Sequence, residues 1–296
     1  MNYYNEIKSK ILKCEIYDKI KNYSKDRNKI KNYFEIGKIL SEAGKEYGKN
    51  IIKEYSNKLT IEIGKKYNER NLRYMRKFYE LFVNQNWNTM CSNLTWSHYR
   101  EVLSLGNFNE IKYYLEECEN KNLSVRELHF KIKTKEYERL DEETKKKLKN
   151  KEELKVPDLV KNPIQIKNTS GNNEISEKVL QKLILEDISS FLKELGSGFS
   201  FIDNEYKIKM GDRYNYIDLL LYNIKYKCYV VVELKVTELN SNHTGQIQKY
   251  MNYIDKNIKN IDDNKTVGII ICKKENRYVI EYCSDDRIIS REYELV

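Results

Sequence analysis

Two short apolar runs joined by a polar connection constrain the fold of this chain more than any other feature. Residues 216–222 and 228–236 are rich in Ile, Leu, Val and Tyr, and each is too short for anything but a strand. Residues 223–227 form a polar connection of hairpin length between them. The sequence therefore predicts a β-hairpin over residues 216–236.

Three charged residues lie within these apolar strands, where a buried charge is costly unless it is paired or binds a metal ion. Asp218 is in the first run, Glu233 is in the second, and Lys235 follows two residues later. If the hairpin folds about the midpoint between Lys225 and Tyr226, Asp218 lies opposite Glu233. The strand period of two puts Lys235 on the same face. The same register predicts three neighbouring apolar pairs: Leu219–Val232, Leu220–Val231 and Leu221–Val230.

Opposed carboxylates beside a lysine have a chemistry of their own. Opposed residues lie about 4.5–5.5 Å apart, and two carboxylates at that distance repel each other unless a cation lies between them. The pair suits Mg²⁺, which takes one or two carboxylates and keeps waters and a substrate phosphate. Lys235 would hold or polarise the attacking water and offset charge in the transition state, so the pattern predicts a metal-dependent phosphodiesterase site. The alternative is that Asp218 caps a strand start and that Glu233 and Lys235 are the frayed polar end of a core strand.

The motif IDLL followed by VVVELK resembles the core of the PD-(D/E)xK nucleases, the restriction-endonuclease-like superfamily. Six segments together resemble the YhcG-type family within it: residues 46–82, 94–105, 192–208, 216–236, 245–255 and 267–283. The resemblance implies that Asp218, Glu233 and the backbone carbonyl of Leu234 hold Mg²⁺ or Mn²⁺. It gives Lys235 the role of assisting the attacking water.

The same resemblance draws attention to glutamines near the site. Many PD-(D/E)xK folds carry an extra acid on the first helix of the domain, and that position falls on Gln181 in this chain. Glu177 and Glu186 are neighbours that could substitute for it. Gln246 matches the Gly-Gln pair of the family and is expected to hydrogen-bond a phosphate or the active-site lysine. Gln248 is the other candidate, and either residue could instead be an exposed helix position.

The composition favours an anionic partner. With 54 Lys and Arg against 45 Asp and Glu, the net charge is +9, which is typical of chains that bind nucleic acid. A genome biased toward lysine would give the same balance. The six cysteines form no C-x-x-C pair, no apolar run approaches the roughly 18 residues that span a membrane, and the N-terminus lacks a signal-peptide pattern. A cytoplasmic protein without membrane contact is expected.

Residues 1–140 are expected to form an all-α domain that binds nucleic acid. Residues 51–63 and 69–82 have helical periodicity and are separated by a short Gly-containing turn, the pattern of a helix-turn-helix. Asn68 is the expected N-cap of the second helix. That helix carries donors suited to phosphates or base edges: Arg70, Asn71, Arg73, Arg76 and Lys77. The family resemblance favours a winged-helix-like DNA-binding domain, and the alternative is a solvated basic face on a surface helix.

The second half of the chain is expected to hold a linker and then the nuclease domain. Residues 141–175 carry Lys and Glu runs, both prolines and an Asn/Ser/Gly patch, which are typical of a linker. Residues 176–296 follow as the nuclease domain. Its expected elements are a helix over 176–195, a strand over 199–210, the hairpin, a helix over 242–257, and strands over 266–272 and 278–283. This order predicts a mixed sheet with helices on both faces, and so a two-domain α+β protein.

Together these features predict a metal-dependent DNA endonuclease. Duplex or branched DNA is the expected substrate, with DNA processing, recombination or phage defence as the setting. Cutting both strands would require a homodimer, because one chain offers one site. One alternative is a nuclease-fold DNA-binding regulator with weak or no catalysis, which Gln181 suggests. Another is a toxin-type or other interaction module whose helical domain binds a protein partner.

Overall fold

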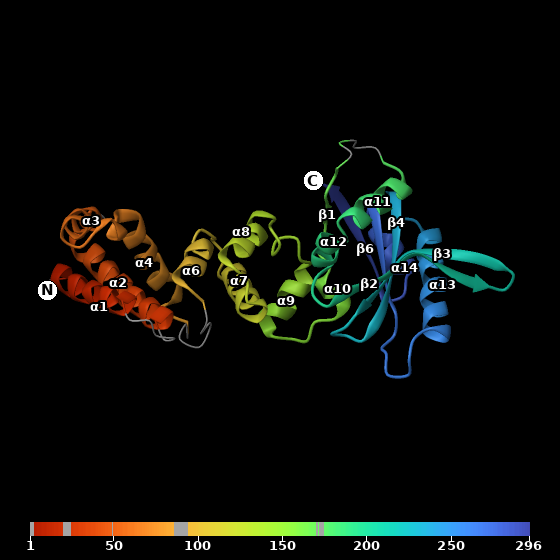
Figure 1. Cartoon of the computed structure of the whole chain (residues 1–296), viewed down its shortest axis with the longest axis horizontal. Helices are drawn as coiled ribbons and strands as arrows, with labels where there is room; N and C mark the ends of the chain where they lie inside the picture. The colour runs from red at the N-terminus through yellow and green to blue at the C-terminus, as the bar shows by residue number, and fades with distance from the viewer. Residues whose placement is uncertain (1–2, 20–24, 49, 86–93, 170, 172–174) are drawn as a thin grey trace. The chain divides into compact units, whose positions relative to one another are not determined.

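The computed structural model describes residues 3–19, 25–48, 50–85, 94–169, 171 and 175–296. The chain divides into two compact units, Met1–Tyr137 and Glu138–Val296, which run from red to yellow-green and from green to blue in Figure 1. None of the helices among the described residues is long and apolar enough to cross a membrane.

The first unit, Met1–Tyr137 (the helical unit), contains only helices and turns among its described residues. Its elements are α1 (Tyr3–Lys19), α2 (Lys25–Tyr47), α3 (Ile51–Glu62), the 3₁₀ helix η1 (Lys65–Tyr67), α4 (Glu69–Phe82), α6 (Trp96–Val102), α7 (Phe108–Lys121) and α8 (Val125–Lys133). The predicted all-α character is confirmed. Because these residues include no strand, the wing of a winged helix has no counterpart among them.

The predicted helix-turn-helix corresponds to α3, η1 and α4. The turn begins at Gly64, whose φ of 147° is a conformation that favours glycine. α4 begins after Asn68, whose side-chain oxygen accepts a hydrogen bond from the backbone N–H of Asn71 at 3.1 Å, so the predicted N-cap is confirmed. The buried face of α4 consists of Leu72, Met75, Phe78 and Phe82. The basic side chains of this helix therefore lie outside its buried stripe.

α2 and α4 cross at close range because Gly37 on α2 has no side chain. A Cβ at this position would lie 2.1 Å from the carbonyl oxygen of Met75 and 2.9 Å from the Cβ of Tyr79. The carbonyl belongs to the backbone of α4, so it cannot move aside without moving the helix. A Cβ at Gly44 on the same helix would meet only Arg76 Nη1, at 3.6 Å, which is an ordinary contact.

We therefore expect Gly37→Ala to destabilise the helical unit by about 1–3 kcal/mol, because an overpacked crossing forces backbone shifts. Gly44→Ala is the matched control, and it should be neutral or stabilising by up to about 1 kcal/mol, because alanine is the better helix former. Thermal unfolding followed by far-ultraviolet circular dichroism measures both. Equal melting temperatures for the two variants would contradict the close crossing.

The second unit, Glu138–Val296 (the sheet unit), is built on one six-stranded sheet. Its strands are β1 (Ile164–Ile166), β2 (Phe199–Met210), β3 (Arg213–Asn223), β4 (Cys228–Glu238), β5 (Val267–Lys274) and β6 (Ile288–Leu295), and their order in space is β1-β6-β5-β4-β3-β2. β2, β3 and β4 are antiparallel neighbours, whereas β4 pairs with β5, β5 with β6, and β6 with β1 in parallel. The predicted mixed sheet is confirmed.

Helices cover both faces of this sheet, as predicted (Figure 1). One core joins alternate residues of β3 and β4 to α11 (Glu177–Glu186) and α12 (Ile188–Leu195). A second core joins Leu220 and Val231, which point the other way, to α13 (Ser241–Asn257) and α14 (Arg277–Cys283). The expected single helix over 176–195 is wrong in one respect. The chain breaks at Asp187, whose carboxylate accepts a hydrogen bond from the Ser190 backbone N–H at 3.2 Å.

The predicted linker over 141–175 is wrong for much of its length, because the structure incorporates it into the sheet unit. It contains α9 (Glu142–Asn150), α10 (Val156–Leu159) and β1. Val156, Val160 and Ile164 are buried in the core under α11 and α12. Arg291 on β6 also binds this segment, through the carbonyl of Val160 at 3.0 Å and the carboxylate of Asp141 at 2.6 Å. A few apolar residues spaced along a charged segment are enough to fold it onto the sheet.

The last predicted strand is also wrong. Residues 277–283 form the helix α14, which begins after Asn276, and the edge of the parallel ladder is taken by β6 and β1 instead. Asn276 caps the helix by accepting a hydrogen bond from the backbone N–H of Val279 at 3.4 Å. Apolar runs this short fit either a strand or a helix, so periodicity alone could not decide between them.

Candidate active site

The predicted register of the β3–β4 hairpin is confirmed, and it places two carboxylates at one end of the ladder. The observed pairs include Leu219↔Val232, Leu220↔Val231 and Leu221↔Val230. Asp218 and Glu233 are the next residues along each strand, beyond the last pair. There the Oδ2 atom of Asp218 accepts a hydrogen bond from the backbone N–H of Leu234 at 2.8 Å. The two carboxylates therefore meet where β3 separates from β4.

Glu233 is the most deeply buried charged residue of this site. It is 1% exposed, and its Oε2 atom accepts a hydrogen bond from Gln246 Nε2 at 3.0 Å. Its Oε1 atom is buried without a hydrogen-bond partner among the described residues. Burial, followed by the charge of Asp218, raises the pKa of Glu233 to about 8. Burial likewise raises the pKa of Asp218, although the Leu234 N–H and Lys235 oppose the rise.

Lys235 lies between two acids. Its Nζ atom is 3.4 Å from Glu233 Oε2 and 3.5 Å from Glu177 Oε2, and the residue is 8% exposed. Burial lowers the pKa of Lys235, but Glu233, Glu177 and Asp218 together raise it further, so the net shift is upward. The ammonium is therefore held in its charged form. It can act as a fixed cation, and it is not suited to act as a base.

α11 contributes two residues to the site, and only one of them is an acid. Gln181 is buried, and its Nε2 atom donates a hydrogen bond to the backbone carbonyl of Asp218 at 3.0 Å. Glu177, one turn earlier, is the acid that reaches Lys235. Glu186 instead accepts a hydrogen bond from Thr169 Oγ1 at 2.8 Å and is not among the partners of the site. Of the two acids that could substitute at the Gln181 position, the structure brings only Glu177 to the strands.

α13 supplies a second group of contacts. Gln246 Nε2 also donates to the hydroxyl oxygen of Tyr250, at 3.1 Å, so this glutamine holds the Glu233 carboxylate and is not bonded to the lysine. Gln248 donates to Asn252 on its own helix. Sequence reasoning missed Tyr250, although its spacing of four residues from Gln246 was a usable signal. It also missed Glu205 on β2, whose charge contributes to the raised pKa of Asp218.

The donors at this site suit a hard divalent cation. An orphaned, buried carboxylate oxygen on Glu233 and a second carboxylate on Asp218 are the kind of ligands that Mg²⁺ takes, with waters and a substrate phosphate filling the remaining positions. In the described part of the chain, no group of three or more His, Cys, Asp or Glu side chains is arranged to hold a metal ion. The residues therefore fit a cation that keeps several water ligands, and they do not fit a closed structural metal site.

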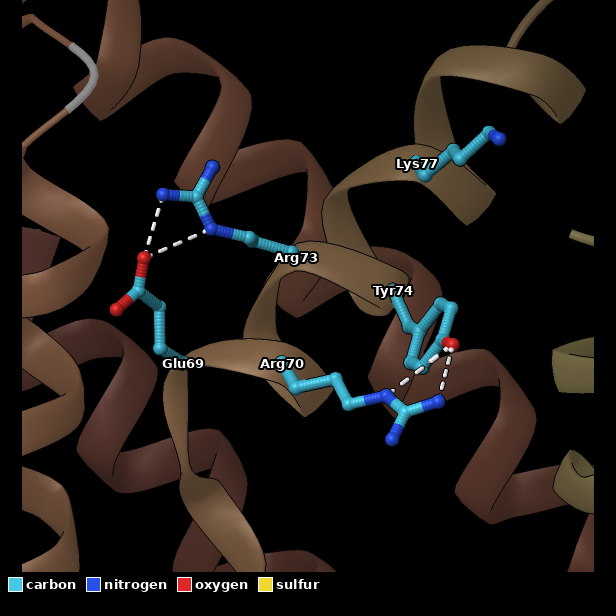
Figure 2. A pocket seen from close by; sticks show the side chains of 5 residues that line it. All are labelled: Glu69, Arg70, Arg73, Tyr74 and Lys77. Carbon is cyan, nitrogen blue, oxygen red and sulfur yellow. Dashed lines mark hydrogen bonds and ion pairs between the residues drawn. The ribbon is translucent and has the colours of Figure 1, made fainter. Parts of the chain in front are cut away.

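The five residues predicted to bind nucleic acid on α4 do not all lie together. Arg70, Arg73 and Lys77 line an open pocket of about 510 Å³ together with Glu69 and Tyr74 (Figure 2). Within it, Arg73 forms an ion pair with Glu69, and Arg70 donates to the Tyr74 hydroxyl oxygen at 3.2 Å. Figure 2 shows the Lys77 side chain pointing away from the Arg73–Glu69 pair.

The other two predicted residues of α4 make different contacts. Asn71 Nδ2 donates to the backbone carbonyl of Lys66 at 2.7 Å, which fixes the turn before the helix. Arg76 Nε lies 3.3 Å from Glu80 Oε1, and its guanidinium approaches Gly44 on α2. Of the five predicted residues, the structure therefore brings three to one face.

Comparisons with known proteins identify the family of both units. Residues 157–295 match the model of the YhcG PDDEXK nuclease domain, and residues 10–139 match that of the DUF1016 N-terminal domain. The sheet unit is thus a PDDEXK nuclease domain. The chain is 24% identical to "Putative nuclease YhcG" of Escherichia coli (strain K12), over 89% of this chain and 82% of that protein. The chain belongs to the YhcG family, and the predicted family is confirmed.

Two solved structures are similar to part of the chain. One is described as a repair endonuclease from Pyrococcus abyssi, with 19% identity, 43% of this chain covered and a TM-score of 0.29. The other is described as an EndoMS–dsDNA2 complex, with 16% identity, 44% of this chain covered and a TM-score of 0.29. The matches cover 49% and 48% of those chains, about half of each. TM-scores this low support no conclusion about this chain.

Proposed function

We propose that this protein is a Mg²⁺- or Mn²⁺-dependent DNA endonuclease. The observation that carries the proposal is the arrangement at the end of the β3–β4 ladder. There, Asp218 and Glu233 lie beside the ammonium of Lys235, and one oxygen of Glu233 is buried without a hydrogen-bond partner among the described residues. A nuclease-family domain that places two carboxylates and one lysine in this way has the groups that hydrolysis of a phosphodiester requires.

Asp218, Glu233 and the carbonyl of Leu234 would hold the metal ion. When bound, the ion lowers the pKa of a water ligand and neutralises charge on the phosphate. Lys235, kept charged by its acidic neighbours, would orient the attacking water and stabilise the negative charge that develops on the phosphate oxygens. Gln246 keeps the Glu233 carboxylate in place, and the Leu234 N–H does the same for Asp218.

DNA is the substrate that the basic surface of the helical unit favours. Arg70, Arg73 and Lys77 present donors on one face of α4, where guanidinium and ammonium groups would contact backbone phosphates. Because one chain carries one such pair of carboxylates at the ladder, cutting both strands would take two copies, which light scattering of the protein–DNA complex would detect.

The direct test is cleavage of a set of substrates, comprising supercoiled plasmid, linear duplex, four-way junction and single strand, with Mg²⁺, with Mn²⁺ and with chelator. We expect cleavage that requires the metal ion and is lost in Asp218→Asn. Cleavage that persists in chelator, or that is unchanged in Asp218→Asn, would contradict the proposed site.

A nuclease-fold DNA-binding regulator is the second candidate, and Gln181 favours it. The amide of this residue is already used as a donor to the Asp218 carbonyl, so α11 offers no carboxylate at that position. This candidate predicts DNA binding that is independent of Mg²⁺, with no cleavage of any substrate in either metal ion. The same set of substrates therefore separates the two candidates.

The basic side chains on α4 lead to a separate prediction about the salt dependence of DNA binding. The variant Arg70→Ala/Arg73→Ala/Lys77→Ala should weaken duplex binding and lower the steepness of log affinity against log salt by about 2–3. The reason is that fewer counterions are released from the DNA when the protein contacts fewer phosphates. The matched control is Lys53→Ala/Arg126→Ala/Lys133→Ala, which removes three exposed charges from α3 and α8. Fluorescence anisotropy in chelator measures both. Equal slopes in the two variants would assign DNA binding to another surface, and a slope near zero in the wild type would favour a protein partner.

A further inference from the structure

The β2–β3 hairpin extends beyond the sheet to which it belongs. β3 pairs with β4 only from Leu219 to Asn223, whereas it pairs with β2 as far as Arg213. Residues 206–217 (the arm) therefore form a two-stranded ribbon without a third strand, and Figure 1 shows this teal hairpin reaching past α13. The arm ends in the two-residue turn Gly211–Asp212, where Gly211 has the positive φ of 61° that such a turn requires.

The two faces of the arm differ in chemistry. Its inner face packs into the core on α13 through Tyr206, Ile208, Met210 and Ile217. Its outer face carries four exposed side chains: Lys207, Lys209, Tyr214 and Tyr216. The register pairs Lys207 with Tyr216 and Lys209 with Tyr214, so these four residues share one face. The outer face is therefore basic and aromatic.

Contacts between the two lysines and a tyrosine ring hold the side chains of the outer face in place. Lys207 Nζ lies 4.0 Å from the centroid of the Tyr214 ring, and Lys209 Nζ lies 5.9 Å from it. Tyr214 is 55% exposed and Tyr216 is 52% exposed, so both rings keep surface that a ligand can reach, although Lys207 lies over one face of the Tyr214 ring. Asp212 is the only acid within residues 206–217, against Lys207, Lys209 and Arg213.

The arm leads directly into the candidate active site. Asp218 follows its last residue, and the ladder skips the position where Asp218 would pair with Glu205. Glu205 there has a φ of 49°, which is unusual for a residue with a side chain and marks a break in β2. At about 3.3 Å per residue, Tyr216 lies roughly 7 Å and Tyr214 roughly 13 Å from Asp218 along the strand. A strand of nucleic acid that lies on the outer face would therefore come close to Asp218.

We propose that the outer face of the arm binds an unpaired strand of nucleic acid and directs it to Asp218 and Glu233. The lysines contact its phosphates, and the two tyrosine rings stack against its bases. The bases of a duplex are already stacked on one another, whereas exposed rings along a cationic ribbon suit bases that are free. This inference rests on the proposed nuclease function, and it narrows the substrate to DNA with a single-stranded or frayed segment.

The test is fluorescence anisotropy of the full chain with a labelled single strand and with its duplex, in chelator so that cleavage does not contribute. We expect Tyr214→Ala/Tyr216→Ala to bind the single strand about 30-fold or more weakly, because each stacked base contributes to affinity. Tyr278→Ala/Tyr282→Ala is the matched control and should bind as the wild type does. It removes two rings from α14 that are 75% and 73% exposed.

The lysines give an independent measurement. Lys207→Ala/Lys209→Ala should lower the salt slope for the single strand by about 1.4, which corresponds to two lost phosphate contacts. Lys225→Ala/Lys256→Ala is its control, because both residues are exposed and lie outside the arm. Single-strand affinity that is unchanged in both arm variants would overturn the proposal. An equal loss of duplex and single-strand affinity in Tyr214→Ala/Tyr216→Ala would overturn the preference for unpaired bases.

The binding measurement is separable from the nuclease proposal. If no substrate is cleaved but the arm variants lose single-strand affinity, the nuclease function fails and the arm surface stands. If the wild type cleaves in a metal-dependent way and the arm variants bind and cleave as it does, the arm proposal fails and the nuclease function stands.

Discussion

Lys235→Met is expected to lower the rate of DNA cleavage by a factor on the order of 10²–10³ while leaving the protein folded. The ammonium lies 3.4 Å from Glu233 and is kept charged by three acids, so in the proposed site it is the fixed positive charge nearest the reacting phosphate. Losing one such preorganised group typically costs this much in rate. Methionine keeps the length and packing of the buried stem, so the loss would report on the charge.

Single-turnover cleavage at saturating Mg²⁺ or Mn²⁺ measures the effect, and circular dichroism reports whether the fold is intact. Lys182→Met is the matched control on α11. Its side chain is 76% exposed and pairs only loosely with Glu186 at 3.9 Å, so its cleavage rate should equal that of the wild type. A Lys235→Met protein that cleaves at the wild-type rate would remove Lys235 from the mechanism, and with it much of the argument for the β3–β4 site.

The register of the site was predictable because two independent constraints agree on it. A hairpin with a short polar connection has few possible registers, and a slip of one residue would turn buried Leu219 and Val232 toward the opposite face. The same period of two then places Glu233 and Lys235 together. These relations are local to one hairpin, so they can be derived without knowledge of the rest of the fold.

The residues that the helices contribute to the candidate site were harder to predict, because they depend on how each helix lies over the sheet. Both Gln181 and Glu177 lie on α11, and the sequence cannot say which of them reaches Asp218 and which reaches Lys235. In the structure, Gln181 donates a hydrogen bond to the backbone carbonyl of Asp218, and Glu177 pairs with Lys235. The incorporation of residues 141–169 was missed for a similar reason. Val156, Val160 and Ile164 find their partners only in the core under α11 and α12.

The raised pKa of Glu233 leads to the second large prediction, which concerns stability. Its pKa is about 8 in the folded protein against an ordinary value of 4.5, so the folded protein keeps a proton that the unfolded chain releases. Stability should therefore fall as pH rises from about 4.5 to about 8, and level off above that. Each unit between the two pKa values corresponds to about 1.4 kcal/mol, which gives a total loss on the order of 3–5 kcal/mol.

Glu233→Gln should remove most of this pH dependence and be more stable than the wild type near pH 8. The neutral amide needs no proton to be buried, and its oxygen can still accept the hydrogen bond of Gln246. Thermal unfolding in chelator, recorded across this pH range, measures both proteins. Glu238→Gln is the control, because it makes the same substitution on the same strand at a side chain that is 49% exposed.

Addition of Mg²⁺ should restore the stability that the wild type loses at high pH, and it should have no such effect on Glu233→Gln. A cation that binds the folded protein stabilises it by an amount that grows with its affinity, and here affinity should rise with pH because the ion must displace the proton of Glu233. The melting temperature of the wild type should therefore rise on addition of Mg²⁺, more at pH 8 than at pH 6, while that of Glu233→Gln stays where it was. An equal rise in both proteins would mean that the ion binds elsewhere. The same data would then leave the buried Glu233 oxygen without a chemical role, because nothing else in the proposed site needs a carboxylate there.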